Sequence, residues 1–309
     1  MMTRVIALGM IGMFTAKGAP MHRADEIYTA GLETMITQSK VIVTGPVANF
    51  SKHVLQSHTP SGTPLRWEIQ GEVREAQILK GDPPQLPIRF TRLENSTLLD
   101  QPETSPWESD YLQWQIGDRA LIFFTGSDPS KEMRVYPSGS GERDLASQVG
   151  RIIAIESISD PAKRFEAWRN ALTSAHAMAE KHAALRSLMA FKKPWSEMQP
   201  IFRRGMGDAG TRLFIFGLVA YGIVHEQWAN LNDPAGFLCE SIANETNDDL
   251  TVGYLGAFGL LLNFATEDAH REERKSLRDR LDFCLQQTCL ARSKKTVEAC
   301  KDLRARYFR

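Results

Sequence analysis

Hydrophobic residues in the first half of the chain recur at every second position, which predicts β-strands. The strand segments are short and separated by Gly and Pro, and they comprise 40–47, 67–78, 86–90, 112–116 and 120–124. In the second segment the parity of the apolar positions shifts, which predicts a β-bulge near Arg74 and Glu75. The last segment, ALIFF, is apolar at every position, as expected of a central strand. Short strands at this spacing predict a small closed β-barrel.

From about residue 145 onward the apolar spacing becomes helical. Phe165, Trp168 and Leu172 fall on one stripe, at positions i, i+3 and i+7. Two later segments, 208–222 and 248–262, align with an offset of 40 residues, which lies in the range of two-helix repeats. We therefore expect an all-α domain that is HEAT-like or irregular.

The apolar segments of the first half also carry a family resemblance. The residues concerned are QSKVIVTGPV, a long strand that ends in ILKGD, then PIRF, and finally IGDRALIFF. Together they resemble the OB barrel of the netrin-like, tissue-inhibitor-of-metalloproteinases type, over roughly residues 35–140. In those inhibitors the activity resides in an N-terminal cysteine held by disulfides. Because this region contains no cysteine, the resemblance implies the fold but not metalloproteinase inhibition.

These patterns give an α+β multidomain protein, with an OB-like (netrin-like) β-barrel over residues 19–144 and a helical domain over 145–309.

Residues 1–18 have the pattern of a signal peptide. Arg4 precedes an apolar stretch, Val5–Phe14, that is too short to span a bilayer. Ala16 and Gly18 then supply small residues at the two positions that a signal peptidase reads. A buried N-terminal helix or strand is the alternative interpretation. We expect an exported protein, periplasmic or secreted, with no membrane span.

Residues 205–210 (GMGDAG) have the glycine spacing of a dinucleotide-binding loop. Such a loop follows a strand directly, but the preceding QPIFRR contains Pro200 and two arginines. The alternative is a turn between helices, with glycines ending one helix and Asp208 capping the next. We predict the turn.

The chain shows no recognisable catalytic or metal-binding motif. His176 and His182 lie roughly 240° apart around a helix, so they cannot share a metal ion. His176 and Glu180 are spaced i, i+4, but no third ligand lies nearby in the sequence. The acidic cluster 267–273 fits a solvated helix start. We expect no metal and no cofactor.

The four cysteines all lie beyond residue 238. Two antiparallel helices are predicted to turn near Arg292 and Ser293, and Cys284 and Cys300 are equidistant from residue 292. We therefore predict a Cys284–Cys300 disulfide, which an oxidising compartment permits. Cys289 lies about 140° around the helix from Cys284, so it would pair with Cys239 or stay free. Four buried thiols are the alternative.

Charge is balanced over the whole chain of 309 residues, with 37 basic and 37 acidic side chains. This balance gives no attraction to nucleic acid or to a membrane surface. Residues 271–309 hold twelve Lys or Arg against six Asp or Glu, and the interleaved acids favour a solvated helical hairpin.

The segment 94–118 holds six acids and no base, and within it about twenty residues connect two predicted strands. Trp107 and Tyr111 stand among the acids Glu108 and Asp110, and such aromatic residues are favoured interface anchors. We expect these four residues to bind a partner protein with a basic surface. The alternative is that both rings pack the loop onto the barrel.

The function that fits these features is protein binding. We expect an exported, non-catalytic binding or interaction protein of the bacterial envelope type. The alternatives are a hydrolase-type enzyme with an unrecognised site between the two domains, and a purely structural envelope protein.

Overall fold

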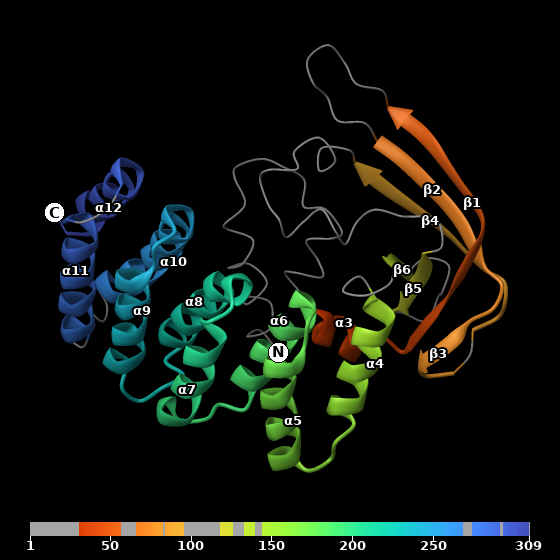
Figure 1. Ribbon diagram of the computed structural model, residues 1–309, viewed down its shortest axis with the longest axis horizontal. Helices are drawn as coiled ribbons and strands as arrows, with labels where there is room; N and C mark the ends of the chain where they lie inside the picture. Colours follow the sequence, from red (N-terminus) through yellow and green to blue (C-terminus); the bar gives the residue numbers. More distant parts are fainter. Residues whose placement is uncertain are drawn as a thin grey trace. The chain divides into compact units, whose positions relative to one another are not determined.

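The computed structural model describes residues 31–56, 66–82, 84–95, 118–125, 133–139, 144–267, 274–290 and 293–308 (Figure 1). Within them an antiparallel sheet is followed by an all-helical region, which confirms the predicted α+β class. The predicted signal peptide and the predicted strand 112–116 lie outside the described residues.

The described strands form one curled sheet, a half-barrel (Figure 1). They are β1 (Val41–Gln56), β2 (Arg66–Val73), β3 (Gln77–Lys80), β4 (Ile88–Asn95), β5 (Arg119–Phe124) and β6 (Met133–Ser138). The order is β4-β2-β1-β5-β6, and β3 also pairs with β1. Strand β6 was not predicted, because Pro137 interrupts its apolar pattern.

The predicted bulge near Arg74 and Glu75 is confirmed. Strand β2 ends at Val73 and β3 begins at Gln77, yet both pair with the single long strand β1. The sheet can bend here because β1 carries Gly45 opposite the break. A Cβ on Gly45 would collide with the backbone carbonyl oxygen of Glu75.

Both faces of the central strands are buried. One face carries the core of the half-barrel, made by Val43, Ile69, Val73, Ile88, Phe90, Ala120, Ile122, Phe124 and Val135. On β1 and β5 the intervening residues Ile42, Leu121 and Phe123 are fully buried as well. Helix α4 (Leu145–Glu156) contacts β3, β6 and the short helix α3 (Leu32–Gln38). The apolar run ALIFF thus forms the central strand that its sequence predicts.

The helices after α4 are α5 (Pro161–Ser174), α6 (Met178–Ala190), α7 (Trp195–Gly205), α8 (Ala209–Val224), α9 (Asn232–Asn244), α10 (Asp248–Thr266), α11 (Lys275–Leu290) and α12 (Lys294–Tyr307). On α5 the predicted stripe of Phe165, Trp168 and Leu172 is buried. No helix in the described part of the chain is both long enough and apolar enough to cross a membrane.

The chain divides into two compact units. One unit contains the described residues up to Ala167 together with Ala175–Ala183, so α4 belongs with the sheet. The other contains Trp168–Ser174 and the residues from Ala184 onward.

Helices α7 to α12 pack in a regular pattern within the second unit (Figure 1). The odd-numbered helices contact one another in succession, α7 with α9 and α9 with α11, and the even-numbered helices do the same. Three helix pairs therefore stack side by side in the described chain. The two segments that align in sequence, 208–222 and 248–262, fall on α8 and α10, which pack directly against each other.

We predict that Gly45→Ala lowers the free energy of unfolding of the sheet unit by about 2–3 kcal/mol, because the added methyl group must displace the backbone of the bulge. Urea unfolding measures this change. Gly150→Ala on α4 is the matched control, since open space surrounds its Cβ position, and we expect it to change stability by less than about 1 kcal/mol. Equal stabilities of Gly45→Ala and the wild type would contradict the bulge argument.

Candidate functional site

The predicted binding residues Trp107, Glu108, Asp110 and Tyr111 lie outside the described residues, in the connection between β4 and β5. Their role stays a prediction.

The glycine-rich stretch 205–210 is the predicted turn between two helices. Helix α7 ends at Gly205, and Asp208 caps α8 by accepting a hydrogen bond of 2.9 Å from the Gly210 N–H. No strand precedes the turn, since residues 195–205 are helical. The turn therefore lacks the context of a dinucleotide-binding loop.

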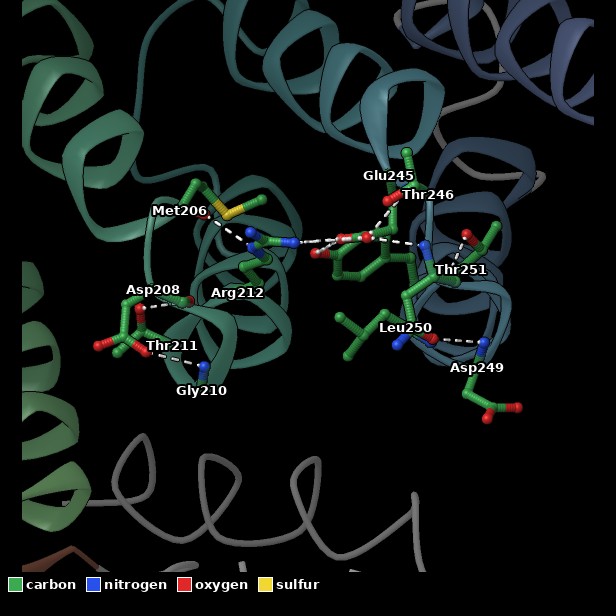
Figure 2. Close-up of polar contacts among 12 residues, drawn as sticks. Met206, Asp208, Gly210, Thr211, Arg212, Glu245, Thr246, Asp249, Leu250 and Thr251 are labelled. Carbon is green, nitrogen blue, oxygen red and sulfur yellow. Dashed lines mark hydrogen bonds and ion pairs between the residues drawn. The ribbon is translucent and has the colours of Figure 1, made fainter. Parts of the chain in front are cut away.

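A buried carboxylate lies close to this turn, on Glu245 at the end of α9 (Figure 2). Its side chain is only 3% exposed. One oxygen, Oε1, accepts hydrogen bonds of 3.0 Å from the backbone N–H groups of Thr246 and Asn247. The other, Oε2, accepts a hydrogen bond of 3.2 Å from the Tyr254 hydroxyl on α10.

The positive partner of this carboxylate comes from α8. The guanidinium Nη1 of Arg212 lies 3.3 Å from Oε2 of Glu245, and its Nε donates to the Met206 carbonyl oxygen at 2.9 Å (Figure 2). The Tyr254 ring stacks on Phe216 of α8 with a centroid separation of 4.5 Å. We call Arg212, Glu245 and Tyr254 the Glu245 cluster. It joins α8, α9 and α10 at one point.

The electrostatics of the cluster keep Glu245 charged. Burial alone would raise the pKa of Glu245, but the Asn247 N–H, the charge of Arg212, the Tyr254 hydroxyl and the Thr246 N–H together lower it. Burial first, and then the charge of Glu245, raise the pKa of Tyr254. Because both carboxylate oxygens already accept hydrogen bonds, the cluster is suited to holding helices together rather than to transferring protons.

A second set of contacts continues along the same helix ends. The Asn247 side chain caps α10 by accepting from the N–H groups of Asp249 and Leu250. The Thr296 hydroxyl in the first turn of α12 donates to Asp248 at 3.2 Å, and Lys295 lies 2.7 Å from Asp249. The first turns of α8, α10 and α12 are thus connected in series. Each contains one fully buried threonine, namely Thr211, Thr251 and Thr296.

One of the residues considered for a metal site, Glu180, pairs with an arginine. Glu180 is buried and forms a bidentate ion pair with Arg151, with contacts of 2.8–3.1 Å. His182 is also buried, on the same helix. In the described ranges no three His, Cys, Asp or Glu side chains cluster to hold a metal ion.

The predicted disulfide is wrong. The bond joins Cys289 to Cys300, with Cα atoms 5.7 Å apart, and Cys284 is a free buried thiol. The prediction used distance from the turn and ignored which side of α11 faces α12. Cys289 lies on that side, whereas Cys284 lies about 140° around the helix.

Comparison of the chain with family models, curated proteins and solved structures gave no match.

We predict that Glu245→Gln lowers the free energy of unfolding of the helical unit by about 2 kcal/mol at neutral pH. The loss is moderate because water partly screens Arg212, which is 32% exposed. The folded-state pKa of Glu245 is lowered, so its contribution is present above the unfolded value of about 4.3 and disappears as the pH falls through the folded value.

Urea unfolding of both proteins across this pH range is the measurement. Wild type and variant should therefore converge in acid. A stability difference that stays constant down to about pH 3 would show that the charge of Glu245 has no part in it.

Proposed function

We propose that this protein is an exported, non-catalytic binding protein, in which a small barrel and a helical scaffold present surfaces to a partner protein. The observation that carries the proposal is the hydrogen bonding of the buried carboxylates of Glu72, Glu180 and Glu245. Each accepts hydrogen bonds from side chains or backbone of its own chain, including an arginine. A carboxylate that acts as a general base must instead lie within hydrogen-bond reach of a substrate proton.

The strand order supports an OB-type barrel for the N-terminal sheet. If β2 and β3 are counted as one bent strand, five strands follow one another in the order β4, β2/β3, β1, β5, β6. The two edge strands, β4 and β6, also contact each other. A five-stranded, partly open barrel is the OB architecture, which is used mainly for binding.

The packing of α7 to α12 supports a HEAT-like repeat for the helical unit. Alternate helices contact each other in two rows, and the sequence repeat falls on neighbouring members of one row. Stacked helix pairs of this kind give extended surfaces that bind other proteins.

The binding surface we propose is the connection between β4 and β5. Strand β4 pairs with β2 and β5 pairs with β1 and β6, so both ends of the connection are fixed to the sheet. Long connections on rigid scaffolds often carry function. Its five acids without a base favour a partner with a basic surface, and they make the binding sensitive to salt.

We predict that the double variant Trp107→Ala, Tyr111→Ala weakens partner binding at least tenfold while leaving the unfolding temperature nearly unchanged. Affinity capture of partners from the native compartment, followed by titration of the captured partner, measures the loss. Phe283→Ala is the matched control, because this ring on α11 is 64% exposed and lies in the other unit. Lost stability with unchanged binding would show that the two rings pack the loop and do not bind.

The export part of the proposal has its own test. We expect N-terminal sequencing of protein purified from its native host to find a chain that begins after residue 18, since a signal peptidase removes the apolar segment. An intact Met1 on cytoplasmic protein would contradict export.

A further inference from the structure

The two cysteines outside the disulfide lie on neighbouring helices. Cys239 belongs to α9 and Cys284 to α11, and these helices contact each other. Neither thiol takes part in the Glu245 cluster or in the Cys289–Cys300 bond.

A ladder of contacts shows that α9 and α11 run side by side in register. The side chain of Asn232 at the start of α9 donates to the Ser276 hydroxyl at 3.1 Å. One turn further, a Cβ on Gly236 would lie 2.6 Å from Nη1 of Arg280, so the Arg280 side chain of α11 reaches over α9 at this level. One more turn along both helices brings Cys239 and Cys284 together, close enough for Cys239 to raise the pKa of the Cys284 thiol.

The two thiols differ in their access to solvent. Cys284 is buried, whereas Cys239 is half-buried. The interaction with Cys239 and burial raise the pKa of the Cys284 thiol, so Cys284 is the less readily ionised of the pair in contact. Cys239 is therefore the thiol that a dissolved reagent reaches first.

From this arrangement we infer that Cys239 and Cys284 form a redox-active dithiol that closes to a second disulfide, between α9 and α11, with a small disulfide such as oxidised glutathione as the oxidant. This goes beyond the proposed binding function and holds whether or not the protein is exported.

The reaction is two successive thiol–disulfide exchanges. The Cys239 thiolate attacks one sulfur of oxidised glutathione, which forms a mixed disulfide and releases one glutathione thiolate. Cys284 then loses its proton to solvent and its sulfur attacks the Cys239 sulfur. The second glutathione leaves. Two protein thiols become one disulfide and one oxidised glutathione becomes two reduced molecules, so atoms and electrons balance.

The new bond would join the pair of α9 and α10 to the pair of α11 and α12. Helix α11 would then be bonded to α12 through Cys289 and to α9 through Cys284. The consequence is a more stable end of the helical stack under oxidising conditions.

The test incubates the folded full-length protein with excess oxidised glutathione, alkylates the remaining thiols after acid quenching, and maps the peptides without reduction. We expect the Cys239 peptide linked to the Cys284 peptide, with Cys289–Cys300 intact, and a Tm raised by roughly 5 °C. Cys239→Ser is the matched variant, because it removes the accessible thiol at a half-buried position and should show neither the link nor the rise in Tm.

Three results would overturn the inference. The first is wild-type protein with Cys239 and Cys284 alkylated and unlinked. The second is Cys239 present only as its glutathione adduct. The third is Cys284 linked to Cys289 or Cys300. Because the reaction is run on purified protein, failure of the export proposal would not change its outcome.

Discussion

The buried carboxylate of Glu245 is the constraint on which the helical unit depends. A charge removed from water must be matched by donors and by an opposite charge, or its burial costs several kcal/mol. Here the donors come from the turn that follows α9, from Tyr254 on α10 and from Arg212 on α8. All three helices must therefore be in place before the charge is satisfied, which makes the spacing between neighbouring helix pairs specific.

Buried and charged groups also connect α10 to α12. In the first turn of α10, Asp248 accepts a hydrogen bond from the Thr296 hydroxyl of α12, and Asp249 accepts one from the Lys295 ammonium group. Acidic side chains are stabilised at a helix N-terminus by its partial positive charge. The two aspartates are therefore stabilised both by the N-terminus of α10 and by their partners on α12. The last helix is mostly polar, with Thr296 and Cys300 as its buried residues.

The sequence was informative wherever the signal is local. The apolar run at β5, the parity shift at the bulge, the helical stripe on α5 and the capping Asp208 all follow from short patterns, and all appear in the structure. The Glu245 cluster could not be found in this way, because its members come from three helices and each is an ordinary residue for its position. The partial signal was the sequence repeat, which places the first turns of α8 and α10 side by side. The prediction of the disulfide was wrong for a related reason, because distance along the chain does not indicate which side of a helix faces its neighbour.

The central claim is that the charge pair of Glu245 and Arg212 joins α8 to α9 and α10. A double-mutant cycle with Arg212→Gln, Glu245→Gln and the double variant tests it most directly, by urea unfolding at neutral pH. We expect a coupling free energy of about 1–2 kcal/mol, since the two side chains are in contact and only one of them is fully buried. Additive effects of the two substitutions would contradict the claim.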